Sequence, residues 1–208
     1  MSVPLVPAPD GRAPRAERRP LVEAGLIAAV ERLAATGTPF SEISIAALVA
    51  EAGIGRATFY LYFPDRASFV MRLADHARDL IAEPLAALWG NLGLDRPALE
   101  AAMREIVGRY RDQRSVISAV IDAAGTDPAI ATRLAEGMRT FIAASTATLE
   151  AAQRAGSIRA ELPCAHTAAA LSWMVERTCY QVARDADDTE LDQLALALAA
   201  ISWHALHR

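Results

Sequence analysis

The 208-residue chain contains no lysine, so all 21 of its basic residues are arginine. It has two cysteines, Cys164 and Cys179, which are fifteen positions apart and form no CxxC pair. Two such thiols are usually small, packed apolar side chains rather than a redox pair. No apolar run reaches the roughly 18 residues of a membrane-spanning helix, and the first residues lack the pattern of a secretion signal. We therefore expect a cytoplasmic protein with no membrane partner.

Common catalytic and cofactor-binding motifs are missing as well. The four histidines, His76, His166, His204 and His207, show no HExxH or other paired-ligand spacing. The chain has no GxSxG, no phosphate-binding GxxxxGK and no GxGxxG. Its acidic residues are scattered along helical segments, where they usually form a solvated face. The sequence therefore predicts a protein that is not an enzyme and that needs neither a metal ion nor a cofactor.

The net charge of −4 hides an uneven distribution. Residues 1–72 carry eight arginines and seven acidic residues, whereas residues 73–208 carry thirteen arginines and eighteen acidic residues. Residues 11–20, GRAPRAERRP, hold four arginines and one glutamate. A negative total therefore does not exclude nucleic acid, because phosphates would meet a local basic arm.

What the sequence does contain is helical periodicity. Residues 1–20 hold five prolines and predict a flexible arm, and apolar residues at helical spacing predict a first helix over 21–35. Ser44 is placed as the N-cap of a second helix, which AGIG at 52–55 ends before a short helix from about 56 to 61. We expect further helices at about 65–83 (interrupted by Pro84), 95–112, 114–124, 127–155, 163–185 and 189–206.

These patterns predict an all-α fold of about nine helices, since no alternating strand pattern is present. We divide it into the arm of residues 1–20, a three-helix helix-turn-helix unit of residues 21–66 and a larger helical bundle of residues 67–208.

The segment GIGRATFYLYFPDR, residues 53–66, holds four of the twelve aromatic residues. Two short helices joined by a glycine-containing turn are typical of a helix-turn-helix, whose second helix enters the major groove of DNA. Arg56 begins that helix, and a bidentate arginine–guanine pair is the commonest specific contact. Phe59 and Phe63 are better suited to face inward. The other interpretation is an aromatic-rich helix packed in a bundle, with its tyrosine hydroxyls at the edge.

Residues 42–69, EISIAALVAEAGIGRATFYLYFPDRASF, resemble the DNA-binding signature of TetR-family transcriptional regulators. The resemblance covers about residues 21–80. It implies apolar contacts to bases and hydroxyl contacts to phosphates around Arg56. The lysine that usually follows the YF motif and contacts phosphate is replaced by Arg66, which keeps the charge. The DNA-binding positions that it implies are Ser44, Arg56, Ala57, Thr58, Tyr60, Leu61, Tyr62 and Arg66.

Residues 171–185, LSWMVERTCYQVARD, are similar to a helix of the ethionamide-resistance regulator branch of that family. Members of the branch have a mostly apolar pocket in which asparagines on this helix anchor amphiphilic ligands. Ser172 and Val175 match those positions, and only Ser172 is polar, which leaves room for a more apolar ligand. Helical spacing and this match give the candidate effector-binding residues Met103, Ile106, Val107, Tyr110, Phe141, Ser172, Trp173, Met174 and Val175, with Trp89 and Tyr180 as further candidates. Such a stripe can also be plain core.

The segment LDQLALALAAISWHAL, residues 191–206, is apolar nearly all round and must be covered by its own domain or by a partner. Pairing of the helices 163–185 and 189–206 across a two-fold axis would form a homodimer, as the family does. A two-fold dimer would present two reading helices to a palindromic DNA site.

The sequence thus predicts a dimeric, DNA-binding transcriptional repressor that a small apolar or amphiphilic molecule releases from its operator. Two alternatives remain. One is a helical small-molecule or lipid-binding protein or enzyme whose first three helices are only scaffold. The other is a nucleoid-type DNA binder without an effector.

Overall fold

The computed structural model describes residues 15–36, 38–90, 95–183 and 186–207, with the side chains of residue 15 and of residues 80–90 left out. Over these residues the chain forms nine α-helices and one short 3₁₀ helix and no strand, which confirms the all-α prediction. The elements are α1 Arg15–Ala35, η1 Phe40–Glu42, α2 Ile45–Glu51, α3 Arg56–Tyr62, α4 Arg66–Gly90, α5 Arg96–Asp112, α6 Arg114–Ala124, α7 Pro128–Arg154, α8 Cys164–Val182 and α9 Asp188–Leu206.

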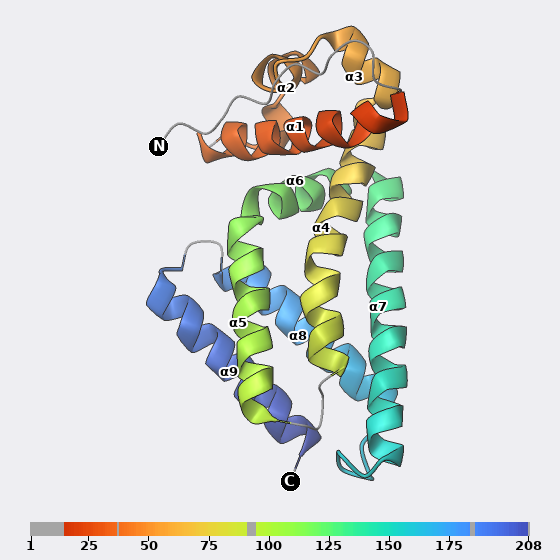
Figure 1. Ribbon diagram of the computed structural model, residues 1–208, viewed down its shortest axis with the longest axis vertical. Coiled ribbons are helices and arrows are strands. Elements are labelled where there is room, and N and C mark those ends of the chain that lie inside the picture. The colour runs from red at the N-terminus through yellow and green to blue at the C-terminus, as the bar shows by residue number, and fades with distance from the viewer. Residues whose placement is uncertain (1–14, 37, 91–94, 184–185, 208) are drawn as a thin grey trace.

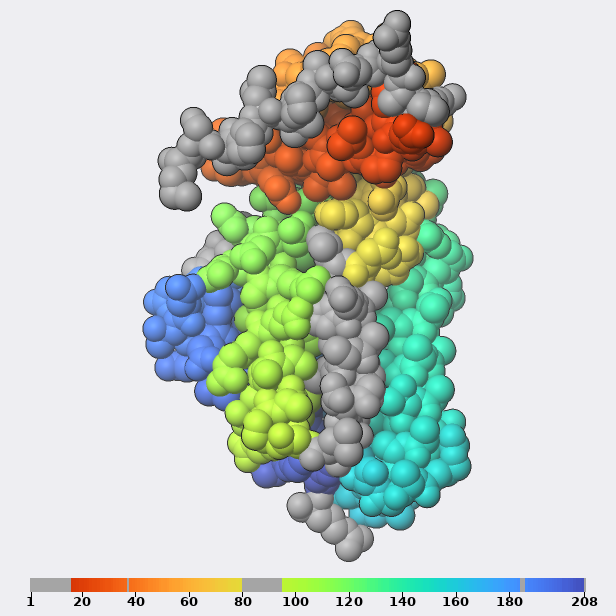
Figure 2. Space-filling model, in the orientation of Figure 1, coloured from red at the N-terminus to blue at the C-terminus, as the bar shows by residue number. Residues whose placement is uncertain are grey.

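The helices form a small head on one end of a longer bundle (Figure 1). Helices α1, α2 and α3 make up the head, and α4 runs from the head into the bundle beside α7. Helix α6 lies across the end of the bundle directly beneath α1. The space-filling view shows the head resting broadly on this end (Figure 2). The head is therefore supported by the bundle rather than carried on a linker.

One apolar cluster runs through the head and into the bundle. It contains buried side chains of α1, α2 and α3, the first turns of α4, and Val116, Ala119 and Val120 of α6. Ile130 of α7 also belongs to it. Because the same cluster holds both parts, the head and the upper bundle share a core. Two other clusters hold α5, α8 and α9 together and join the far end of α7 to α8 and α9.

Two helices are longer than predicted. Helix α1 begins at Arg15, so part of the predicted arm is helical, with Pro20 inside the helix; residues 1–14 lie outside the described residues. Helix α4 continues through Pro84 to Gly90. A proline removes one backbone hydrogen bond, but its fixed φ is compatible with a helix. The prolines alone therefore did not mark the helix ends.

The turn between α2 and α3 depends on Gly53. The Gly53 amide donates to the Ala50 carbonyl (3.2 Å), and the Ile54 amide donates to the Val49 carbonyl (2.9 Å). This is a Schellman cap, and it places Gly53 at φ 69°, which side chains with a Cβ rarely adopt. The turn sets the angle at which α3 leaves α2.

We expect Gly53→Ala to lower the free energy of unfolding by about 1 kcal/mol, because alanine is strained at positive φ although no atom lies within 4 Å of its Cβ. The matched control is Gly25→Ala inside α1, since Gly25 does not have a positive φ and no atom lies within 4 Å of an added Cβ. The control should not lower stability, because alanine is favoured over glycine inside a helix. Urea unfolding at one protein concentration measures both, and equal losses would contradict the role of Gly53.

A buried carboxylate ties α1 to α4. Glu23 is 8% exposed and accepts hydrogen bonds from Arg19 Nε (2.7 Å) and Arg72 Nε (2.8 Å). Burial alone would raise the pKa of the Glu23 carboxyl, but the hydrogen bonds and charges of Arg19 and Arg72 outweigh it and hold the pKa below its ordinary value of 4.5. The ionised form of Glu23 therefore stabilises the folded head.

Because the folded pKa of Glu23 is lowered, its stabilising effect is complete above pH 4.5 and is lost as the pH falls through the folded pKa. We expect Glu23→Gln to lower the free energy of unfolding by about 1–3 kcal/mol at neutral pH, and the difference to shrink in acid. The exposed Glu17→Gln on the same helix should cost less than about 0.5 kcal/mol. Urea titrations at several acidic pH values measure the difference in free energy of unfolding between wild type and Glu23→Gln. A difference that grows as the pH falls would contradict the role of Glu23.

Candidate DNA-binding face and effector cavity

Helix α3 has one buried face and one exposed face. Phe59 is fully buried and Phe63, just after the helix, is 2% exposed, as predicted. Their rings pack against each other and against Phe69 of α4 at centroid distances of 5.3–5.8 Å. These edge and tilted contacts fix the rotation of α3 about its own axis. The opposite face is therefore presented to solvent in one orientation.

Most of the predicted DNA-binding positions lie on this exposed side. Arg56 and Ala57 are exposed at the start of α3, and Tyr60 and Leu61 are 51% and 47% exposed. Thr58 is half-buried between them. Ser44 is the N-cap of α2, as predicted, and its hydroxyl accepts from the Ala47 amide at 3.1 Å. An exposed arginine, a tyrosine hydroxyl and two small apolar groups on one short helix can contact base edges and phosphates.

Tyr62 and Arg66 lie differently from the prediction. Tyr62 is only 7% exposed and belongs to the core cluster of the head, so its ring packs inward. The guanidinium of Arg66 donates to the carbonyls of Ile43 and Phe40 and lies 4.4 Å over the Phe40 ring. Since its donors are engaged with the backbone between η1 and α2, Arg66 positions that segment. The structure does not support the predicted phosphate contact of Arg66.

We expect Arg66→Ala to lower the free energy of unfolding by about 1–3 kcal/mol, because two carbonyl groups lose a charged donor. Arg66→Lys should recover only part of this loss, since an ammonium group cannot reproduce the guanidinium fork. The control is Arg56→Ala, which removes an exposed side chain and should change stability by less than about 0.5 kcal/mol. Chemical unfolding of the three variants tests this, and equal stability of wild type and Arg66→Ala would exclude the role.

A cavity of about 1030 Å³ lies in the bundle, between α4, α5, α6, α7 and α8. Seven of the nine predicted effector-binding residues line it: Met103, Ile106, Tyr110, Phe141, Ser172, Trp173 and Val175. The other two do not. Val107 is 1% exposed and packs in the core of α5, α8 and α9, and Met174 packs between two core clusters. Tyr180 is also outside the lining, and the side chain of Trp89 lies outside the described residues.

Sequence reasoning missed the lining residues from α4, α6 and α9 and most of those from α7. Helix α6 contributes Ile117, Val120 and Ile121, and α7 contributes Leu134 and Met138. Further lining comes from α4 and α9: Ala74, Asp75, Ala77, Arg78, Ser202 and Leu206. The i, i+3, i+4 spacing of the α6 residues was a usable signal, but it cannot distinguish a core face from a cavity wall.

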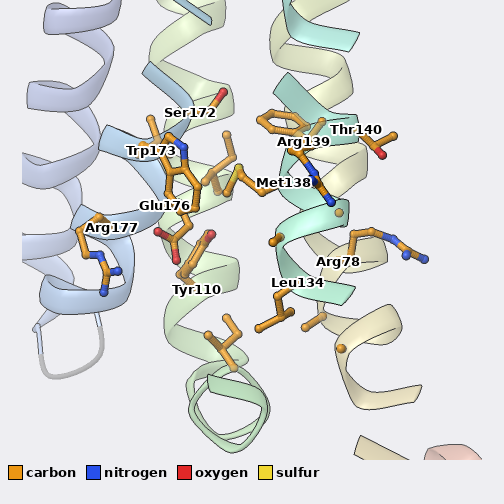
Figure 3. A pocket seen from close by; sticks show the side chains of 18 of the residues that line it. Arg78, Tyr110, Leu134, Met138, Arg139, Thr140, Ser172, Trp173, Glu176 and Arg177 are labelled. Carbon is orange, nitrogen blue, oxygen red and sulfur yellow. The ribbon is translucent and has the colours of Figure 1, made fainter. Parts of the chain in front are cut away.

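The polar groups of the cavity wall fall into two sets. At the α4–α7 side, Asp75 accepts from Arg78 (2.9 Å) and from Arg133 (2.8 Å), and Arg78 also pairs with Asp79 (2.9 Å), so two arginines are matched by two carboxylates. On α8, Ser172 donates to the Ala168 carbonyl at 2.6 Å, and Glu176 faces the cavity near Tyr110 of α5 (Figure 3). Glu176 Oε2 is buried without a hydrogen-bond partner among the described residues.

Neither a metal site nor a membrane span is found over the described part of the chain. No three His, Cys, Asp or Glu side chains gather there in a way that could hold a metal ion. No described helix is both long and apolar enough to cross a bilayer. Cys164 and Cys179 are both buried free thiols.

Comparison with known families identifies this architecture. The model described as "Transcriptional regulator EthR, C-terminal domain" matches residues 99–206, just over half of the chain. The chain belongs to the EthR-like branch of the TetR family of transcriptional regulators. EthR of Mycobacterium tuberculosis H37Rv is 28% identical over 160 residues, which cover 76% of this chain and 74% of that protein. EthR of Mycolicibacterium smegmatis is 26% identical over 188 residues, with 87% and 83% covered.

Solved structures share the fold of this EthR-like regulator. Salmonella enterica GusR superimposes with a TM-score of 0.71 at 18% identity, over 89% of this chain and 95% of that one. A TetR-family regulator of Mesorhizobium loti gives 0.69 at 16% identity, over 94% and 100%. A TetR-like regulator of Rhodococcus sp. RHA1 gives 0.61 at 21% identity, over 91% and 97%. TetR-family proteins bind DNA, act as dimers and are not enzymes, so the predicted class of protein is confirmed.

Proposed function

We propose that this EthR-like regulator is a homodimeric repressor that binds a palindromic operator and leaves it when a small apolar or amphiphilic effector fills the cavity. Two features support the proposal. The first is the exposed face of α3, and the second is a large cavity whose wall is built from the same helices that support the head. The protein would act where the chromosome is, in the cytoplasm.

The exposed side of the head would read DNA. Arg56 at the start of α3 would bond a guanine, and Ala57 and Leu61 would contact thymine methyl groups. Tyr60, and the hydroxyls of Ser44 and Thr58, would contact phosphates. The inward ring of Tyr62 and the engaged guanidinium of Arg66 would hold this surface in shape. The interface therefore needs fewer residues than the sequence alone suggested.

The observation that carries the effector proposal is a shared wall. Ala74 of α4 and Val120 of α6 belong to the core cluster of the head and also line the cavity. A ligand that pushes these helices must move side chains on which the head rests. A ligand acts in this way only if it prefers one state, and a near-complete switch requires a preference of roughly 5 kcal/mol.

The surfaces of α8 and α9 suit a two-fold contact with a second copy. Trp173 and Val182 on α8 are 48% and 45% exposed, and Ile201 on α9 is 52% exposed. The other side of α9 packs in the core of its own domain through Leu191, Ala195 and Leu198. The predicted all-round coverage of α9 would thus need both its own domain and the partner. Family membership supports this mode of assembly.

The decisive experiment is footprinting on the intergenic DNA beside the gene of this protein. We expect a protected palindrome, with weaker binding as salt rises. Arg56→Ala should reduce the preference for the operator over random DNA by an amount equivalent to about 1–3 kcal/mol. Arg154→Ala removes an exposed arginine from the last turn of α7, at the end of the bundle opposite the head (Figure 1), and serves as the control.

The same footprinting experiment, repeated with added compounds, distinguishes the repressor from the two alternative functions. Release of the footprint by amphiphilic compounds supports a repressor with an effector, whereas a footprint that no compound alters supports a DNA binder without one. Absence of any specific footprint, together with tight binding of apolar ligands, would favour a carrier or enzyme that uses the first helices as scaffold.

A further inference from the structure

One polar atom of the cavity wall is buried and unpaired. The carboxyl atom Oε2 of Glu176 has no hydrogen-bond partner among the described residues and no access to solvent. Glu176 lies on α8, one turn after Trp173, and Figure 3 shows its carboxyl group close to Tyr110 of α5 at the cavity wall. An unpaired buried carboxyl oxygen is costly, so its partner is expected to arrive with a ligand.

The neighbouring cation does not satisfy this oxygen. Arg177 follows Glu176 directly and also contributes to the cavity wall, but its guanidinium lies 5.9 Å from the ring centroid of Tyr180 and leaves Glu176 Oε2 without a hydrogen bond. Arg177 is also exposed, so water can solvate its charge. Its charge is therefore near Glu176 without bonding the buried oxygen.

The surroundings of Glu176 are short of positive charge. Burial raises the pKa of the Glu176 carboxyl, and the positive charge of Arg177 opposes this only in part. Burial, together with the charge of Glu176, raises the pKa of the Cys179 thiol to about 12 and also raises that of the Tyr110 hydroxyl. A cation placed beside Glu176 would lower the pKa of its carboxyl and stabilise the ionised form.

Of the other arginines in the cavity wall, Arg78 and Arg133 are paired and Arg139 is exposed. Arg78 pairs with Asp75 and with Asp79, both at 2.9 Å, and Arg133 pairs with Asp75 at 2.8 Å. Arg139 and Glu136 are exposed to water on α7. An anionic ligand group would have to displace an existing acidic partner or compete with water, whereas a cationic group would meet an unpaired acceptor.

The positions first expected to anchor a ligand are less suited to the task. Ser172 already donates its hydroxyl proton to Ala168, and Val175 has no polar atom. Glu176 lies one helical turn beyond Ser172 and one residue beyond Val175. The polar group best placed to hold a ligand therefore lies one turn further along α8 than Ser172.

We propose that Glu176 is the polar anchor of the cavity and that the effector is an apolar molecule carrying an amine or another cationic hydrogen-bond donor. This deepens the proposed function and rests on it. The apolar walls from α5, α6 and α7 would hold the hydrocarbon part, and the donor would bond the free oxygen of Glu176.

The test is calorimetric titration of the full chain with three probes that share a ten-carbon tail: decylamine, decan-1-ol and decanoate, each below its micelle concentration. We expect decylamine to bind at least about tenfold more tightly than decan-1-ol, and decanoate to bind most weakly. Glu176→Gln keeps the size of the side chain and removes its charge. It should bring decylamine within about threefold of decan-1-ol while leaving the affinity for the alcohol unchanged.

Glu150→Gln is the matched control, because Glu150 is an exposed glutamate of α7 outside the cavity wall, and it should keep the preference for the amine. Urea midpoints of both variants show that the fold is retained. Equal binding of amine and alcohol to the wild type, an unchanged preference in Glu176→Gln, or tightest binding of decanoate would each overturn the anchor. Failure of the proposed function would show separately, as absence of an operator footprint in the ligand-free protein.

Discussion

The apolar cluster that joins the head to α6 and α7 is the contact on which the rest of the structure depends. Phe59, Phe63 and Phe69 lock α3 against α4, and Val116 and Ala119 extend the same packing into the bundle. Closely packed cores change between discrete arrangements rather than deforming continuously. The head therefore cannot tilt without repacking side chains beneath it. This gives a bound ligand a mechanical route to the DNA-binding face.

Arginine is the only strong base in the chain, and the structure uses its geometry in several different ways. Arg66 bonds two backbone carbonyls and stacks on Phe40, and Arg72 completes a buried carboxylate network. Arg56 is left exposed at the start of α3. A planar group with several fixed donors can fill structural positions in which a lysine would leave carbonyls unsatisfied. A count of basic residues therefore overestimates the charge that is available to DNA.

The helix order, the cap at Ser44 and the glycine turn at Gly53 could all be read from the sequence, because they depend on local chemistry. The inward direction of Tyr62 and the backbone bonds of Arg66 could not, because they depend on which carbonyls and rings the fold brings alongside. For the same reason, helical spacing identified the residues of α5 that line the cavity but wrongly added Val107. This residue is also on α5, but it packs in the core shared with α8 and α9. Sequence patterns predicted the elements, and tertiary contacts decided the role of each side chain.

Trp173 has a position that links the cavity with the outside of the molecule. It lines the cavity and is also 48% exposed on α8, the helix proposed for the two-fold contact. In such a dimer, a ligand that shifts this indole would alter the surface met by the second subunit. Filling of one cavity would then change the affinity of the other, so the two sites would respond cooperatively to effector concentration. Trp173 would then affect both the binding of the ligand and the steepness of the response to ligand concentration.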